Sequence, residues 1–139
     1  DSFKELVLEK TPRLEQQPLH KNAVIQTEIG QSEAKLSAAR TFLLSELENI
    51  WSAVTASKNV TVTQRMRIRL ASTHAIREAR AVADVLYDAA GASAIFAGSP
   101  FQRRFRDIHT VSQQIQGRKS HFQTVGSFLL GHPPDLAMA

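Results

Sequence analysis

The longest uninterrupted pattern in the chain is a helical spacing of apolar and small residues from Ala23 to about Ala56. The residues recur at intervals of three and four, the period of an α-helix with one buried face. The stripe consists of Ile25, Ile29, Ser32, Leu36, Ala39, Leu43, Leu47, Ile50 and Val54. Such a helix spans about 50 Å, so it must lie lengthwise against other helices. Trp51, the only tryptophan, is expected to pack in a core or an interface.

A second helical stripe, rich in alanine, follows the predicted turn at residues 57–61. It runs from Val62 or Thr63 to Ala90, and Thr63 is the expected N-cap. Its members are Ile68, Ala71, Ala75, Ala79, Val82, Leu86 and Ala89. Because most of them are small, another helix can approach closely along this face.

Small residues dominate the segment 91–100. Gly91 is placed to end the preceding helix, since glycine adopts the backbone conformations that helix C-termini require. The segment is expected to return the chain in the antiparallel direction. In such a loop, Ile95 and Phe96 should tuck inward.

The stretch from Pro100 to Gly131 is predicted to be one long helix, with proline at its start and glycine at its end. The apolar stripe is formed by Phe101, Phe105, Ile108, Ser112, Ile115, Phe122, Val125 and Leu129. Polar residues occupy much of the rest: Arg106, Asp107, His109, Thr110, Gln113, Gln114 and Gln116. A helix with so many hydrogen-bonding groups either lines a site or meets another polar surface.

The N-terminal residues 1–10 resemble the end of a helix with Phe3 and Val7 on one face. Residues 11–22 contain two prolines and are predicted to be a connector. Taken together, the patterns predict an all-α fold, an up-down four-helix bundle of long antiparallel helices. We assign 1–22 to a leading helix end and connector, and 23–135 to the bundle. The chain is expected to be a piece of a longer protein whose helices pack laterally on another domain or subunit.

Composition and charge exclude several classes of protein. The absence of cysteine excludes disulfide and thiolate chemistry and fits a reducing compartment, for which we predict the cytoplasm. No apolar run is long enough to span a membrane. The net charge is +4, but Arg65, Arg67 and Arg69 are two apart and point in different directions on a helix. Nucleic-acid binding is therefore not expected.

Familiar catalytic signatures are missing from the sequence. There is no zinc-protease, CxxC, dinucleotide-binding or P-loop motif. The five histidines form no helical pair of ligand spacing, so no metal site is predicted. Asp107 stands alone among basic residues on its predicted helix, so it is expected to be ionised and paired. Both a structural ion pair and a role in lining a site remain open for it.

Residues 86–131 resemble the end of the C-terminal domain of the acyl-CoA dehydrogenase flavoprotein superfamily. The shared features are a Tyr-x-x-x-Gly helix end at Tyr87–Gly91, a small-residue loop, Pro100-Phe101, and R-x-x-R-D at Arg103–Asp107. Within the superfamily, the chain is most similar to the reduced-flavin-dependent monooxygenases. The resemblance implies a bundle that follows a helical and a β domain, a bound FAD or FMN, a homotetramer or dimer of dimers, and a flavin reductase as partner.

The resemblance also implies roles for individual residues. Gly91 and Ser93 match the loop that approaches the flavin, and Arg106-Asp107 matches the pair that opens the site-facing stretch, with Thr110 one turn beyond. Ser112 and Gln114 fall where relatives contact substrate.

Acyl-CoA dehydrogenases often carry a catalytic glutamate about nine residues beyond that arginine, whereas this chain has amides at Gln113, Gln114 and Gln116. An amide cannot act as a base near neutral pH. Several hydroxylating relatives have a histidine near Gln114, where this chain has glutamine. His109 is not expected to replace that histidine, because it should point to a different side of the helix. The resemblance therefore favours the flavin-site and oligomerisation domain of a monooxygenase. The alternatives are a true acyl-CoA dehydrogenase with its base elsewhere and a non-catalytic helical interaction module.

Overall fold

The computed structural model describes residues 2–13, 16–56, 59–96 and 98–134. In chain order its elements are α1 (Ser2–Glu9), the 3-10 turn η1 (Leu19–Lys21), α2 (Ala23–Thr55), α3 (Val62–Ala90), the 3-10 turn η2 (Gly91–Ala94), α4 (Pro100–Val111), the 3-10 turn η3 (Ile115–Gly117) and α5 (Ser120–Leu129). All regular structure in those ranges is helical, which confirms the predicted all-α fold class.

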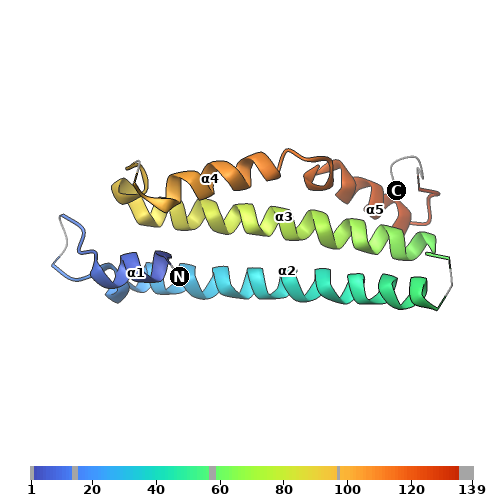
Figure 1. Cartoon of the computed structure of the whole chain (residues 1–139), viewed down its shortest axis with the longest axis horizontal. Helices are drawn as coiled ribbons and strands as arrows, with labels where there is room; N and C mark the ends of the chain where they lie inside the picture. The colour runs from blue at the N-terminus through green and yellow to red at the C-terminus, as the bar shows by residue number, and fades with distance from the viewer. Residues whose placement is uncertain (1, 14–15, 57–58, 97, 135–139) are drawn as a thin grey trace.

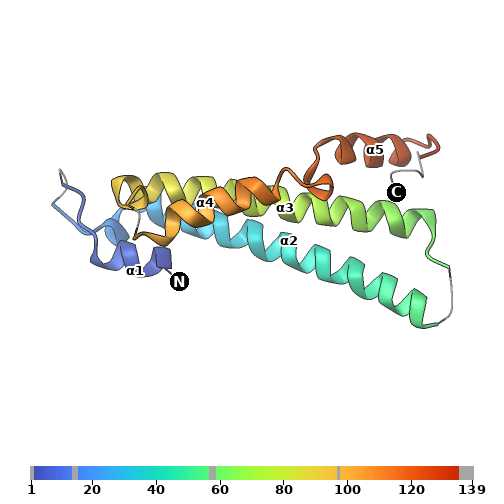
Figure 2. The ribbon, with the colours of Figure 1, turned by 45° about the horizontal axis from the view of Figure 1, so that its top comes forward.

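The molecule is an elongated stack of helices that lie lengthwise on one another (Figures 1 and 2). Helices α2 and α3 run antiparallel along their whole length, and α4 followed by α5 returns along α3 (Figure 1). The short helix α1 lies beside the start of α2, and α3 is in contact with α1, α2, α4 and α5. The predicted up-down order is confirmed.

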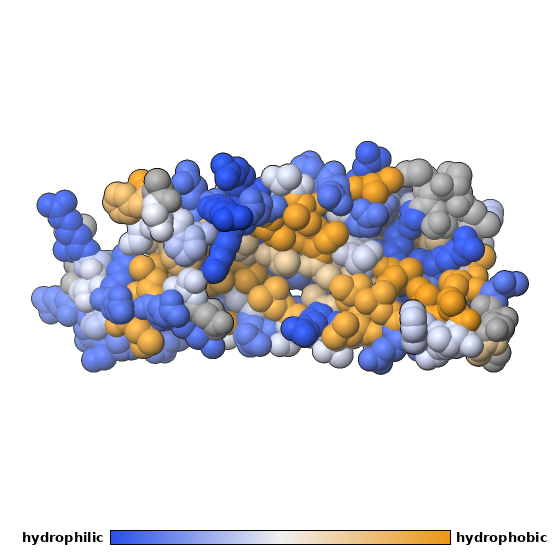
Figure 3. Space-filling view, in the orientation of Figure 1, coloured by the Kyte–Doolittle hydropathy of each residue, from blue (hydrophilic) through white to orange (hydrophobic). Residues whose placement is uncertain are grey.

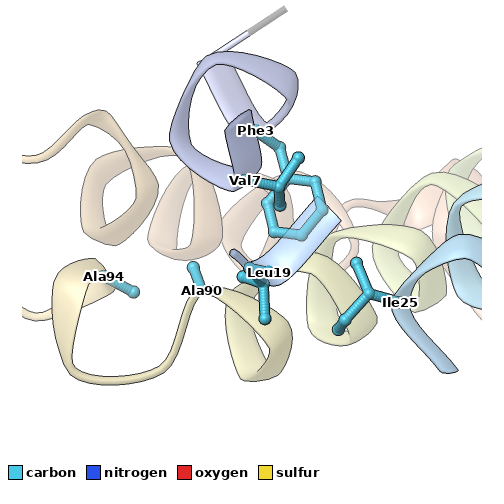
Figure 4. Close-up of a cluster of buried hydrophobic side chains, with 6 residues drawn as sticks. All are labelled: Phe3, Val7, Leu19, Ile25, Ala90 and Ala94. Atoms are coloured by element: carbon cyan, nitrogen blue, oxygen red, sulfur yellow. The ribbon is translucent and has the colours of Figure 1, made fainter. Parts of the chain in front are cut away.

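A cluster of apolar side chains closes the end of the molecule where α1, η1 and the end of α3 meet (Figure 4). It consists of Phe3, Val7, Leu19, Ile25, Ala90 and Ala94. The Lys10 side chain donates a 2.6 Å hydrogen bond from Nζ to the Ala90 carbonyl at the last turn of α3. A lysine there satisfies a carbonyl that has no partner within the helix. The leading helix is thus joined to the bundle by both apolar and polar contacts.

The N-terminus of α3 is capped by Thr61, so the prediction of Thr63 as the N-cap is wrong. Thr61 Oγ1 accepts a 3.2 Å hydrogen bond from the Gln64 amide, and the Gln64 side chain accepts a 2.9 Å bond from the Thr61 amide. This reciprocal pair is a capping box, which needs Thr and Gln three residues apart. Thr63 has no glutamine or glutamate at the corresponding distance, since residue 66 is Met66.

Glycines end two helices as predicted. Gly91 caps α3 with φ +54°, and Gly131 follows α5 with φ +90°. Beyond α5, the Gly131 amide donates to the Phe128 carbonyl and the His132 amide to the Ser127 carbonyl, at 3.0 and 3.1 Å. These two bonds form a Schellman motif, in which a residue without Cβ takes the left-handed conformation at low cost.

The prediction of one helix over Pro100–Gly131 is wrong, because the chain leaves the helix after Val111. Gln114 is extended, with ψ 158°, and a single 3-10 turn leads to α5. The apolar stripe is correspondingly divided. Its members in α4 lie half-buried on α3 and Val125 is buried, but Ile115, Phe122 and Leu129 are exposed.

One flank of α2 is apolar but only partly covered. The buried residues Ile25, Ser32, Ala39 and Glu46 recur every seven positions and face α3. Leu36, Leu47 and Val54 of the same helix are exposed. Figure 3 shows apolar surface where α2 and α3 lie side by side. Trp51 is 72% exposed, so it is not part of the core formed by the described residues.

Ile95 and Phe96 are exposed, so their predicted inward position is wrong. The short turn η2 directs Ala94 inward in their place, where it joins the cluster at the end of α3. Within the described ranges, none of the helices has the length and apolar character needed to cross a bilayer.

Glu46 is a carboxylate in a core position, only 2% exposed. Its Oε1 accepts a 2.9 Å hydrogen bond from Arg67 Nε, and this bond, with the negative charge of Glu46, raises the pKa of the Arg67 guanidinium. A buried carboxylate needs such a partner because water no longer solvates it. The pair joins α2 to α3 at a position that the apolar stripe alone did not predict.

We expect Arg67→Leu to destabilise the bundle more than the double variant Arg67→Leu/Glu46→Leu. The single change leaves Glu46 buried without its partner, whereas the double change replaces the pair by apolar side chains. Urea unfolding followed by circular dichroism measures both free energies of unfolding. A double variant at least as unstable as the single variant would contradict this role for the pair.

Candidate functional site

Helix α4 has an apolar inner face and a polar outer face. Phe101, Phe105 and Ile108 lie half-buried against α3. On the opposite side, Arg106 and Thr110 are exposed. The helix begins with Ser99 as N-cap and Pro100 in its first turn, a combination that favours initiation at this point. The outer face is therefore presented by a well-defined helix.

The predicted site residues Arg106, Asp107, Thr110 and Gln114 all lie on the exposed side of α4 or at its C-terminal end. Arg106, Thr110 and Gln114 are spaced by four, and the Thr110 hydroxyl donates to the Arg106 carbonyl at 2.9 Å. Asp107 is paired as predicted, but with Arg103 of the preceding turn, at 3.5 Å, rather than with its neighbour. Both of these side chains are largely exposed, so the pair contributes little to stability.

Ser112 does not share this outer surface. It is 1% exposed, its hydroxyl donates to the His109 carbonyl at 2.7 Å, and Arg80 Nη1 of α3 lies 3.4 Å from the same oxygen. The hydroxyl is thus used inside the bundle, where it ends α4. This position argues against direct contact of Ser112 with a ligand on the outer face.

Gly91 and Ser93 are at the other end of α4. Both lie in the turn η2, Gly91 exposed and Ser93 half-buried. The 12 residues of α4 separate this turn from Gln114, or roughly 18 Å of helix. The structure therefore does not bring the two predicted parts of the site together within this chain.

His109 contacts Asp84 of α3, a partner that no sequence pattern indicated. Its Nε2 lies 3.1 Å from Asp84 Oδ1, and its Nδ1 lies 2.8 Å from the Phe105 carbonyl. Among the described residues Asp84 Oδ1 accepts no hydrogen bond, so the two side chains are close without one. The ring also stacks at 4.1 Å on Phe105, which stacks at 4.4 Å on Tyr87. His109 faces α3, whereas Gln114 lies beyond the end of α4 and is exposed.

The segment between α4 and α5 is held against α3 by a buried threonine. Thr73 Oγ1 lies 2.7 Å from the Gln116 carbonyl and 3.0 Å from His121 Nδ1. Burial lowers the pKa of the His121 imidazole, and the positive charges of Arg69 and Arg118 lower it further. No sequence motif indicated this cluster, because its members are distant in the chain.

Gly117 fits this segment because it has no side chain. A Cβ there would lie 2.8 Å from the Ser112 carbonyl oxygen and 3.2 Å from Ile76 Cγ2. The chain thus folds back on the end of α4 and packs against α3. The exposed Gln114 lies in that turn.

A mainly aromatic cavity lies away from Gln114. It holds about 160 Å³ between α1, α3 and α4 and is lined by Phe3, Ala83, Leu86, Tyr87, Phe101, Arg104 and Phe105. Among the described residues, no three His, Cys, Asp or Glu side chains gather as a metal site would require. The outer face of α4 is thus an open wall rather than a closed pocket.

Comparison with known proteins identifies the family. The model of the acyl-CoA dehydrogenase C-terminal domain matches residues 1–118. The chain belongs to this family. The indole-3-acetate monooxygenases of Acinetobacter baumannii and Pseudomonas putida are 30% identical over 111 residues and 32% identical over 123 residues. A pigment production hydroxylase of Rhodococcus erythropolis is 37% identical over 81 residues.

The chain covers only part of these relatives. The matches include 80% and 88% of this chain but 28% and 30% of the two monooxygenases. Two solved structures share the fold: the HsaA monooxygenase from M. tuberculosis (TM-score 0.82, 22% identity) and a 3-HSA hydroxylase from Rhodococcus (TM-score 0.83, 21% identity). Each covers 99% of this chain, and the chain covers 36% and 35% of them. The predicted four-helix-bundle domain of the acyl-CoA dehydrogenase superfamily is confirmed.

We expect Gly117→Ala to destabilise the domain by about 1–3 kcal/mol, because its methyl group has no room between Ser112 and Ile76. Gly126→Ala in α5 is the matched control. A Cβ there meets nothing within 4 Å, so alanine should be neutral or stabilising by up to about 1 kcal/mol. Urea unfolding of both variants checks this, and equal effects would show that the turn tolerates a side chain.

Proposed function

We propose that this domain supplies one wall of the flavin site, and the surface for self-association, in a flavin-dependent monooxygenase. The outer face of α4 supports the first part. Arg106 and Thr110 lie along it four residues apart, Gln114 follows on the turn beyond the helix, and all three are exposed, although each is capable of strong hydrogen bonding. Three relatives are called monooxygenases or hydroxylases, which favours that chemistry for the whole protein.

The donor set on this wall fits a flavin. A guanidinium, a hydroxyl and an amide match the carbonyl and nitrogen edge of the ring system and the phosphate of FAD or FMN. When bound, reduced flavin supplies the electrons that activate O2. Arg106 would bind an anionic or carbonyl oxygen, and Gln114 would orient the flavin or the substrate. Ser112 would act indirectly, by ending α4 so that Gln114 is exposed.

The absence of a base on this wall favours oxygenation over acyl-CoA dehydrogenation. Gln113, Gln114 and Gln116 are amides, which cannot remove a substrate proton near neutral pH. Asp107, the carboxylate on this face, is paired with Arg103. An aromatic substrate with a carboxylate, such as the indole-3-acetate of two relatives, would suit Arg106. We propose that the enzyme works in the cytoplasm with a flavin reductase.

The second part of the proposal rests on the partly covered flank of α2. Leu36, Leu47, Val54 and Trp51 are exposed there, and contiguous apolar surface of this kind marks an interface. A homo-oligomer, a tetramer or a dimer of dimers, would cover it. The same observation favours the alternative function, a helical interaction module without a cofactor.

The test is made in the full-length protein with Arg106→Ala and Gln114→Ala. Loss of one charge-assisted hydrogen bond should weaken flavin binding or slow turnover about 10-fold to 100-fold for Arg106, with a smaller effect for Gln114. Flavin affinity is measured by fluorescence. Turnover is measured as incorporation of ¹⁸O from labelled O2 into indole-3-acetate with reduced flavin present.

Arg40→Ala is the matched control, since Arg40 is an exposed arginine on α2, and it should change neither quantity. Unchanged flavin affinity and turnover in the combined Arg106 and Gln114 variant would reject the site and leave the interaction module. Efficient reduction of the flavin by an acyl-CoA, with no oxygen incorporation, would favour the dehydrogenase.

A further inference from the structure

A fully buried polar cluster lies where α3 meets the turn η3 and the start of α5. Thr73 is 0% exposed and His121 is 6% exposed. The Thr73 hydroxyl has one proton, which it donates to the Gln116 carbonyl at 2.7 Å. The 3.0 Å contact with His121 Nδ1 therefore requires the imidazole to donate its Nδ1 proton to Thr73 Oγ1. One threonine thus binds both the turn and the helix that follows it.

This cluster fixes the turn that carries Gln114. The Gly117 amide donates to the Gln114 carbonyl at 2.9 Å, and the Gln114 amide donates to the Val111 carbonyl at 3.0 Å. The turn is thus compact in itself, and Thr73 fixes it to α3 through the neighbouring carbonyl of Gln116. The position of this turn on α3 therefore depends on Thr73. The position of the exposed Gln114 side chain depends on it as well.

The charges around His121 make this attachment sensitive to acid. Burial opposes a positive charge on the ring most strongly, and the charges of Arg69 on α3 and Arg118 beside the turn add to it. The Gln116 carbonyl acts in the opposite direction, and the net effect is a lowered pKa of His121. Arg69 Nη1 is itself buried and has no hydrogen-bond partner among the described residues. A proton added at Nε2 would place a positive charge at a buried position close to Arg69.

We infer that Thr73 and His121 are positioning residues that hold the Gln114 turn and α5 on α3, and that protonation of His121 releases them. The inference rests on the proposed function, because Gln114 is the part of the flavin wall that the turn carries. The direction of the pH effect follows from the linkage between proton binding and docking. The released state binds a proton near the ordinary pKa of about 6.5 and the docked state at a lower pH. Docking is therefore strongest above about pH 7 and weakens as the pH falls through 6.5.

Two substitutions at position 73 of the full-length protein separate the hydroxyl from the shape of the side chain. Thr73→Val keeps the shape and removes the hydroxyl, whereas Thr73→Ser keeps the hydroxyl. We expect Thr73→Val to lower the hydrogen-exchange protection of the amides from Gln116 to Val125 at least 10-fold, and to raise KM or lower kcat. Thr73→Ser should restore protection and kinetics. Equal protection in the valine variant and the wild type would overturn the inference.

A pH series tests the role of His121 and does not depend on whether Thr73→Val folds. His121→Asn keeps an N–H donor near the position of Nδ1 and removes the ionisable ring. In the wild type, protection of α5 should fall about 10-fold between pH 7 and pH 5, and in His121→Asn it should stay constant. A wild type whose α5 is equally protected at both pH values would overturn the acid-sensitive attachment.

Hydrogen exchange also separates this inference from the proposed function. If protection changes as expected in Thr73→Val but flavin affinity and turnover are unaffected, the threonine holds the turn and Gln114 does not belong to a flavin site. That outcome supports the attachment by Thr73 and rejects only the role of Gln114 in the proposed site. If protection does not change, the attachment itself is wrong, whatever the kinetics show.

Discussion

The burial of α3 is the constraint on which the rest of the structure depends. Its contacts extend to every other α-helix of the described chain, and small buried residues such as Ala71, Thr73 and Ala90 allow those helices to approach closely. Polar contacts then select the alignment. Arg67 pairs with Glu46 on α2, Asp84 lies against His109 on α4, and Thr73 binds His121 on α5. Each of these three neighbours thus meets α3 through apolar packing and through at least one polar contact.

Helical period predicted the existence, type and limits of α2 and α3, since both are long and regular stripes with clear ends. It did not predict the break between α4 and α5. The residues from Ser112 to Gln116 are compatible with a helix on local grounds, and the stripe keeps its phase across the gap. The break depends on tertiary contacts: Gly117 lies against Ser112 and Ile76, and Thr73 holds the Gln116 carbonyl. A pattern of single residues carries no information about such contacts.

The candidate site was likewise predictable only in part. Periodicity and the family resemblance together placed Arg106, Thr110 and Gln114 on a polar side of one helix. In the structure Arg106 and Thr110 are exposed on α4, and Gln114 is exposed on the turn beyond it. The partners of buried groups were not predictable, because they come from other helices. Asp84 beside His109 is one example, and Glu46 within an apolar stripe is another. Trp51 was expected in a core or an interface, and its exposure excludes only the core of the described residues.

The central claim, that the outer face of α4 forms one wall of a flavin site, is tested most directly by an experimental structure of the full-length protein with its flavin bound. We expect the ring system or phosphate of the flavin within hydrogen-bonding distance of Arg106 or Gln114, with the turn from Ser112 to Lys119 docked on α3. A flavin bound elsewhere, with the outer face of α4 in solvent or covered only by another protein surface, would contradict the claim.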